Sequence, residues 1–152
     1  MRIARTLVLA SSLLLAGCGG EGVKPSPECP AVRLSGGVYA TFQVAEDRFH
    51  AWITDPAAIE QAIALWEGQS TATFPAGRLV CAAVSWNCPW SWHIDPNDLR
   101  FVEAAIELCD GRPSLVEASC PNFGGGTYCP WAAQLVELRD CRSDTSCPDL
   151  PR

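Results

Sequence analysis

Positive charge is scarce in this 152-residue sequence, and lysine and arginine form no cluster. Eleven basic residues stand against seventeen acidic ones, which gives a net charge of −6 and a pI near 4.8. Proteins bind nucleic acids by neutralising phosphates with such clusters, so we expect no nucleic-acid partner. The chain is nevertheless 48% hydrophobic and only 18% charged, which excludes a disordered protein, and its length suits one domain.

The motifs of common catalytic and metal sites are also missing. The sequence has no Gly-x-Ser-x-Gly and no His-Glu-x-x-His, and the glycines at 124–126 lack the Lys-Ser/Thr of a phosphate loop. No two cysteines have the C-x₂-C spacing, and His50 and His93 stand too far apart for an H-x₃₋₅-H pair. We therefore predict no metal site and no cofactor, and we expect a protein that is not an enzyme.

The N-terminus reads MRIARTLVLASSLLLAGC, with Arg2 and Arg5 before an apolar stretch from Leu7 to Leu15. This stretch is shorter than the roughly 20 residues of a membrane-spanning helix and is typical of a signal peptide. Its end, Leu-Ala-Gly-Cys at 15–18, resembles the bacterial lipobox. There the chain is cut before the cysteine, which receives a diacylglyceryl group and a further acyl chain such as palmitate. We predict a signal peptide at 1–17 and lipidation of Cys18; an ordinary secretory signal with a chance cysteine is the alternative.

Such a protein would be held at the cell envelope by its lipid, and Gly19 favours the outer membrane because inner-membrane retention prefers aspartate there. The mature chain keeps nine basic against seventeen acidic side chains, a net charge of −8. Nine cysteines become eight once Cys18 carries lipid. In an oxidising compartment eight cysteines predict up to four disulfides, with 105 possible pairings. The candidates are Cys29, Cys81, Cys88, Cys109, Cys120, Cys129, Cys141 and Cys147.

Composition divides the mature chain into a flexible tether at 18–30, one domain at 31–141 and a polar tail at 142–152, which Cys141 and Cys147 would staple. Alternation of side chains predicts strands at 38–44 and 49–53, joined as a hairpin. Asp55 as N-cap, Pro56 at the first helical position and Gly68 after the end delimit a helix, with Ile59, Ala62, Ile63 and Trp66 on its buried face. Further strands are expected at 78–86, 101–109 and 130–139, a short helix at 113–117 and a flexible loop at 124–126. This is an α+β fold with a mainly antiparallel sheet.

The segment Asn87–Pro96 concentrates the residues that could form a site. As a strand it places Trp90 and Trp92 on one face and His93 on the other. His93 could act as a general base or ligand, helped by Asp95 or Asp110. Each residue also has a structural interpretation: Asp95-Pro96 repeats the capping pattern of Asp55-Pro56, and a lone strand histidine is commonly a packing residue. The candidate binding residues are Asn87, Trp90, Trp92, His93, Asp95 and Asp110.

Five blocks of sequence carry a family resemblance over about residues 38–140. They are FHAWITDPAAIEQA, GRLV, NCPWSWHIDP, IELCDGRPSLVE and YCPWAAQLVELRD. The chain resembles a family of small secreted domains named after the N-terminal domain of a eukaryotic calmodulin-binding protein. The resemblance implies a compact extracytoplasmic domain of unassigned function, supplies no catalytic residues, and favours a Cys109–Cys129 disulfide. Calmodulin itself is not an expected partner, because its targets are basic amphipathic helices and this chain is acidic.

We interpret the protein as a lipid-anchored, disulfide-stapled envelope domain with a binding or structural role, whose partner is an envelope or extracellular protein. One alternative is an enzyme or metal-dependent site around His93, Asp95 and Asp110. Another is an inhibitor of extracellular proteases that uses the loop from Cys81 to Pro89.

Overall fold

The computed structural model describes residues 28–152, apart from the side chain of Glu107. The predicted signal peptide, Cys18 and most of the tether lie outside the described residues. Within residues 28–152, no helix is both long and apolar enough to cross a bilayer.

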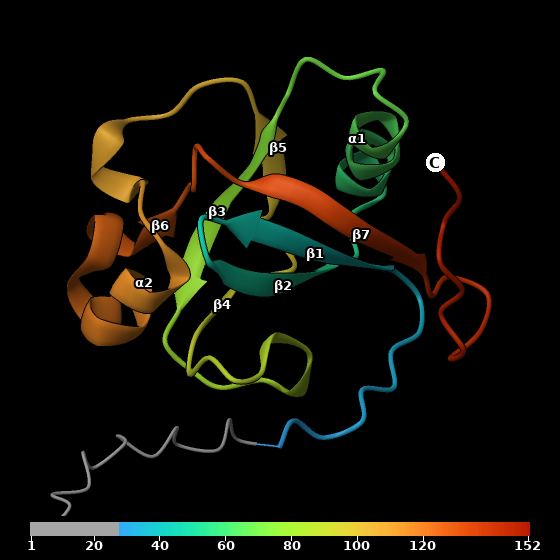
Figure 1. The fold of residues 1–152 in the computed structure, drawn as a ribbon, viewed down its shortest axis with the longest axis horizontal. Coiled ribbons are helices and arrows are strands. Elements are labelled where there is room, and N and C mark those ends of the chain that lie inside the picture. Colours follow the sequence, from blue (N-terminus) through green and yellow to red (C-terminus); the bar gives the residue numbers. More distant parts are fainter. Residues whose placement is uncertain (1–27) are drawn as a thin grey trace, which may run out of the picture.

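The first sheet is built on the predicted hairpin. Strand β1 (Val38–Val44) pairs antiparallel with β2 (Asp47–Ile53), and on its other edge with β7 (Gln134–Asp140), giving the order β2-β1-β7 (Figure 1). The hairpin register places Thr41 opposite His50. On the β7 side the register shifts between Thr41 and Phe42, which brings Glu137 opposite Thr41.

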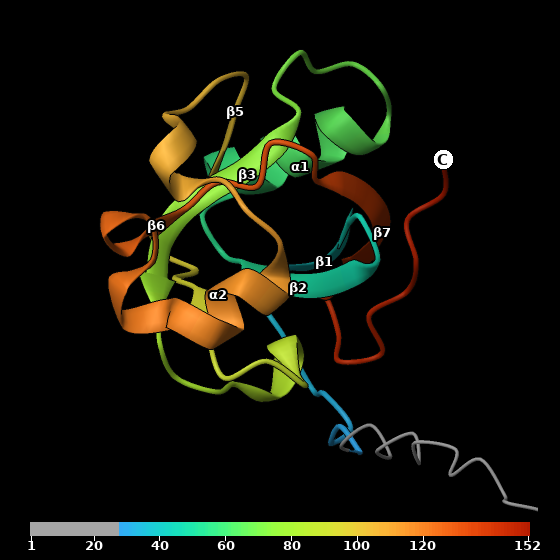
Figure 2. The same ribbon diagram turned by 60° about the vertical axis from the view of Figure 1, so that its left-hand side comes forward.

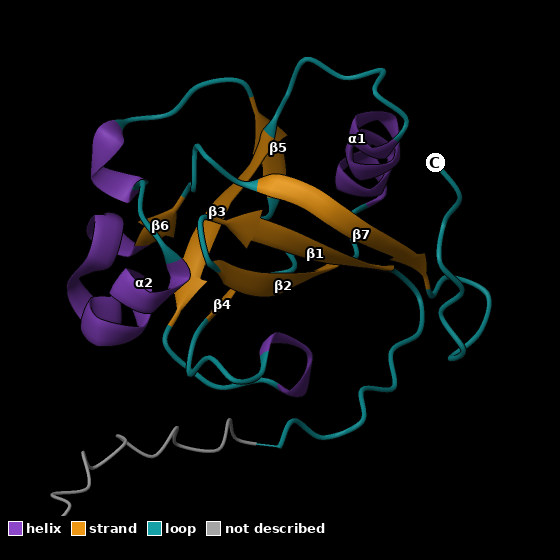
Figure 3. Cartoon of the chain, viewed as in Figure 1, coloured by secondary structure: helices purple, strands orange, loops and turns teal. Residues whose placement is uncertain are grey.

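The second sheet is centred on β3 (Phe74–Val80), which crosses behind the first sheet (Figure 3). Three short antiparallel strands pair with successive parts of β3. They are β5 (Arg100–Val102) at its start, β6 (Thr127–Tyr128) at its middle and β4 (His93–Ile94) at its end. At Gly77 an added Cβ would lie 2.7 Å from Cγ2 of Ile94, so glycine is required for this close approach.

Two α-helices lie at different ends of the molecule (Figure 2). Helix α1 (Pro56–Trp66) begins as predicted, with Asp55 accepting a 2.9 Å hydrogen bond from the backbone N of Ala58. It packs beside β5 and β7 and buries Ala58, Ile59 and Ala62. Helix α2 (Pro113–Ser119) contains the predicted short helix and continues into the 3₁₀ segment Cys120–Gly126. The predicted glycine loop at 124–126 lies in this segment, where the three glycines have φ between +57° and +88°.

Aromatic side chains fill the space between the sheets. Phe49 lies 5.2 Å from Phe42, 5.8 Å from Trp92 and 5.5 Å from Tyr128, measured between ring centroids. All four rings are fully buried. Large buried rings dominate the burial energy of a small domain, so this cluster is the centre of the core.

All eight cysteines within residues 28–152 form disulfides, in agreement with the predicted set. The bridges are Cys29–Cys88, Cys81–Cys120, Cys109–Cys129 and Cys141–Cys147. The third is the pair that the family resemblance favoured, and the fourth staples the C-terminal tail as expected.

The predicted strand at 101–109 is wrong beyond Val102. Strand β5 pairs with β3 only as far as Val102 opposite Phe74, where β3 begins, so later residues have no partner strand. The chain then leaves the sheet and forms a 3₁₀ turn at Glu107–Cys109, which leaves Ile106 68% and Leu108 70% exposed.

Two other predicted strands have different bounds. The strand expected at 78–86 starts earlier, at Phe74, and ends at Val80; the chain turns away at the bridged Cys81, and Ser85–Asn87 is a 3₁₀ turn. The strand expected at 130–139 starts only at Gln134, because a turn closed by Ala133 N donating to Pro130 O precedes it. Likewise Trp90 and Trp92 precede the short strand β4 instead of lying in it, although their rings stay 6.1 Å apart.

Candidate functional site

Asn87 is a fully buried connector in the structure. Its Oδ1 accepts a 2.7 Å hydrogen bond from the backbone N of His50, and its Nδ2 donates a 2.7 Å bond to the carbonyl of Trp92. Strand β2 is an edge of the first sheet, so the His50 N–H would otherwise be unpaired. Asn87 therefore covers the sheet edge and fixes the loop in front of β4.

The two candidate tryptophans have different surroundings. Trp92 belongs to the core, where its ring lies 5.2 Å from that of Tyr128. Trp90 is half-buried, and its indole N–H donates a 2.7 Å bond to the carbonyl of Arg48. Between them, Ser91 is bound through its backbone N and hydroxyl to the carboxylate of Glu117 on α2, at 2.9 and 2.7 Å. Only Trp90 of the pair is available to a ligand.

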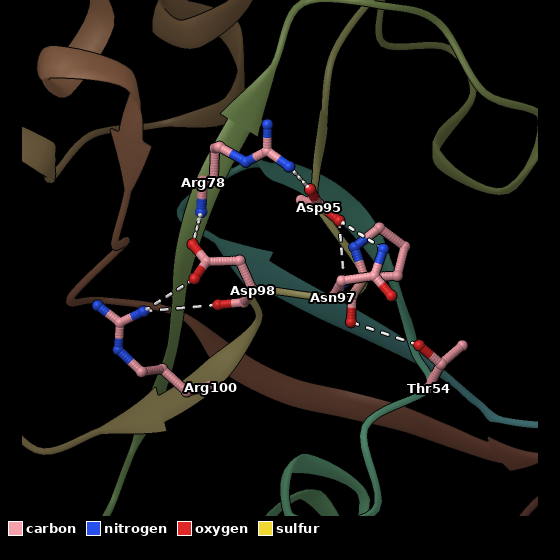
Figure 4. Close-up of polar contacts among 7 residues, drawn as sticks. Thr54, Arg78, Asp95, Asn97, Asp98 and Arg100 are labelled. Atoms are coloured by element: carbon pink, nitrogen blue, oxygen red, sulfur yellow. Dashed lines mark hydrogen bonds and ion pairs between the residues drawn. The ribbon is translucent and has the colours of Figure 1, made fainter.

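Asp95 is buried and holds a turn (Figure 4). Its Oδ1 accepts hydrogen bonds from the backbone N and the side-chain amide of Asn97, and its Oδ2 pairs with the guanidinium of Arg78. The bond from the Asn97 backbone, with a smaller contribution from Arg78, lowers the pKa of Asp95 against the opposing effect of burial. Asp98 next to this turn accepts a 2.7 Å bond from the backbone N of Arg78. Asp95 thus caps the turn after β4, the role that the Asp-Pro pattern indicated.

His93 and Asp110 are each held by neighbours other than one another. Nδ1 of His93 lies 2.8 Å from the carbonyl of Ala82, and the ring packs edge-on against Trp86 at 5.7 Å. Asp110 accepts bonds from the backbone N of Gly111 and of Trp131, both at 2.8 Å. In the described part of the chain, no hydrogen bond or ion pair joins His93 to Asp95 or Asp110. The structure does not assemble these residues into a catalytic set.

The first sheet instead brings together polar side chains that the sequence interpretation did not select. Oγ1 of the buried Thr41 donates to Oε2 of Glu137 at 2.9 Å and lies 3.1 Å from Nδ1 of His50. Since the hydroxyl has one proton, Nδ1 of His50 is the donor in the second contact. Tyr39 stacks on the His50 ring at 5.2 Å, and Glu137 also pairs with Nε of Arg139 at 2.9 Å.

Burial governs the titration of this polar cluster. It lowers the pKa of His50, against the opposing effect of Glu137, so the imidazole is neutral at pH 7. Burial and the charge of Glu137 raise the pKa of Tyr39 to about 12. The hydroxyl of Thr41 is committed to Glu137 and is not available as a nucleophile. The cluster therefore stabilises the three-stranded sheet, and its hydrogen bonds run in one direction from His50 to Glu137.

Two shallow depressions border these elements. One of about 200 Å³ lies between Tyr39, Arg139 and the stapled tail at Ser146 and Cys147. Another of about 300 Å³ lies beside the 3₁₀ turn Ser85–Asn87 and is almost entirely apolar. Across residues 28–152, no group of three or more His, Cys, Asp or Glu side chains could hold a metal ion.

Comparison with known families extends this description. The model of the family named after the N-terminal domain of a calmodulin-binding protein matches residues 37–142, which is more than half of the chain. The chain belongs to this N-terminal domain family. This confirms the family resemblance found in the sequence, and the match is to a domain and not to an enzyme family. Neither the curated proteins nor the solved structures contain a match.

The family match begins just before β1 and ends just after β7, so it contains both sheets. It includes both partners of Cys81–Cys120 and of Cys109–Cys129. The other two bridges cross its limits, because Cys29 and Cys147 lie outside the matched residues while Cys88 and Cys141 lie inside. These two bridges fasten the flanking segments to the family domain.

Proposed function

We propose that the protein is a lipid-anchored binding domain of the cell envelope, attached through Cys18. The observation that carries this proposal is the pairing of the cysteines. Eight of the nine are used in four disulfides, and the ninth is the one at the lipobox-like sequence. Disulfides persist in oxidising, extracytoplasmic compartments, which supports export of the chain. A lipidated Cys18 gives the remaining thiol a role.

A binding role is favoured over catalysis by the way the polar residues are used. Asn87, Asp95 and Asp110 all satisfy backbone groups, and Thr41 is bonded to Glu137. An active site needs a nucleophile or a base that is free to reach a substrate. The partner that we propose is a protein of the envelope or its exterior.

Mass analysis of the N-terminal peptide tests the anchor directly. The full-length chain is expressed in a bacterium that processes lipoproteins, and we expect the peptide to begin at an acylated Cys18. Cys18→Ser should move the protein from the membrane fraction to the soluble envelope fraction, while His93→Ala, a matched control inside the domain, should stay in the membrane. A wild-type chain without acyl groups would overturn the proposal. Cross-linking in intact envelopes then identifies the partner.

A further inference from the structure

The tether meets the domain at a fixed point. The Cys29–Cys88 bridge joins the start of the described chain to the loop between β3 and β4, with 5.6 Å between the two Cα atoms. Figures 1 and 2 both show the blue N-terminal segment beside this loop. Because Cys29 lies outside the family match, this bridge attaches an added segment to one chosen place on the domain.

An apolar depression of about 300 Å³ lies at that place. We call it the tether-root surface; its lining residues, besides Cys88, are Pro30, Ala83, Val84, Ser85, Pro89 and Trp90. Ala83, Ser85 and Pro89 are exposed, and the stretch 79–92 carries no charged side chain although the chain as a whole is acidic. The indole N–H of Trp90 is already bonded to the carbonyl of Arg48. The surface therefore presents carbon to its surroundings without an unpaired charge.

The length of the tether limits what can cover this surface. Ten residues, 19–28, separate Cys18 from Cys29, and ten residues span at most about 35 Å. A lipid on Cys18 therefore holds the tether-root surface within reach of the bilayer interface at every moment. Small apolar side chains with a tryptophan are suited to that interface, where aromatic rings are enriched.

A second exposed apolar region serves as a comparison. Ile106 and Leu108 flank the 3₁₀ turn Glu107–Cys109, and both are more exposed than any residue named in the core. In Figures 1 and 2 this golden turn lies on the other side of the molecule from the N-terminal segment. A membrane contact through the tether-root surface would turn this region away from the lipid.

We propose that the tether-root surface rests on the bilayer interface and orients the domain on the membrane, an inference that rests on the proposed lipid anchor. The lipid and the surface then act as two attachments on the same side of the domain. The Cys29–Cys88 bridge keeps them together, and the face carrying Ile106 and Leu108 is presented to partners.

Photo-cross-linking of the full-length protein in its own envelope tests the orientation. A benzophenone amino acid replaces Ala83 in one chain and Leu108 in a second, and adducts are analysed by mass after irradiation. We expect phospholipid adducts from position 83 and not from position 108. Ser85→Glu, combined with the probe at 83, should reduce the lipid adduct severalfold, because it adds charge to the surface. Ala104→Glu, an equally exposed change beside Ile106, should leave the yield unchanged.

The outcomes separate the two proposals. A chain whose Cys18 carries no acyl group overturns the anchor and the orientation together. An acylated chain that gives no lipid adduct at 83, or equal lipid adducts at 83 and 108, overturns the orientation alone. Adducts from 83 to a protein instead of lipid also overturn it, and would show that this loop is a protein-binding surface, as a protease inhibitor would require.

Discussion

Replacing Asn87 by alanine should be strongly destabilising. The change leaves the His50 N–H and the Trp92 carbonyl without partners, and both bonds are 2.7 Å long at a fully buried side chain. An unpaired buried polar group costs about 1–3 kcal/mol, so we expect a loss of about 3–5 kcal/mol. This is a large part of the total stability of a small domain.

Urea unfolding at pH 7, followed by tryptophan fluorescence with the disulfides intact, measures this loss. Asn122→Ala is the matched control, because that side chain is exposed, and its effect should stay within about 0.5 kcal/mol. Asn87→Asp keeps an acceptor for His50 but removes the donor to Trp92 and buries a charge, so it should cost at least as much as Asn87→Ala. A loss below about 0.5 kcal/mol for Asn87→Ala would refute the connector role.

Two further predictions concern Asp95 and the flanking disulfides. The folded state lowers the pKa of Asp95 through the Asn97 backbone bond and Arg78, so its carboxylate stabilises the fold above the unfolded pKa and this contribution disappears as pH falls through the folded pKa. Asp95→Asn should therefore be less stable than wild type near pH 7 and approach it below about pH 4 in urea unfolding; an equal difference at both pH values contradicts this. Double replacement by serine should cost about 4 kcal/mol for Cys29–Cys88 and about 2 kcal/mol for Cys141–Cys147, because the separations are 59 and 6 residues. The reverse order in calorimetry would rule out the loop-closure explanation.

The parts of the fold that were predictable have local causes. The hairpin follows from alternation on both sides of a tight turn, and α1 from the adjacent Asp55 and Pro56, whose capping geometry the structure contains. Residues 101–109 alternate equally well, yet only the first two belong to a strand. Alternation reports which side chains are apolar, whereas a strand also needs a partner, and β3 begins at Phe74. Nothing near residue 103 in the sequence carries that information.

The polar cluster on the first sheet shows the same limit. Thr41 and His50 face each other in the hairpin, so their contact could have been derived from the predicted turn alone. Glu137 is 96 residues away from Thr41, and it reaches the hydroxyl only because the β1–β7 register shifts beside Thr41. An irregular register between distant strands has no signature in either strand, and this is why the sequence pointed to His93 and not to His50.

The disulfides have two different tasks, which the cysteine count could not distinguish. Cys81–Cys120 and Cys109–Cys129 lie inside the family domain and join β3, the turn Glu107–Cys109 and the α2 region, where the strands are two or three residues long. Short strands bury little surface, so covalent links replace part of the stabilisation that longer strands would supply. Cys29–Cys88 and Cys141–Cys147 fasten segments outside the family domain to its regular half. If the first pair stabilises and the second positions, loss of Cys109–Cys129 should expose the α2 region to proteases, whereas loss of Cys29–Cys88 should leave the domain folded and change its orientation on the membrane.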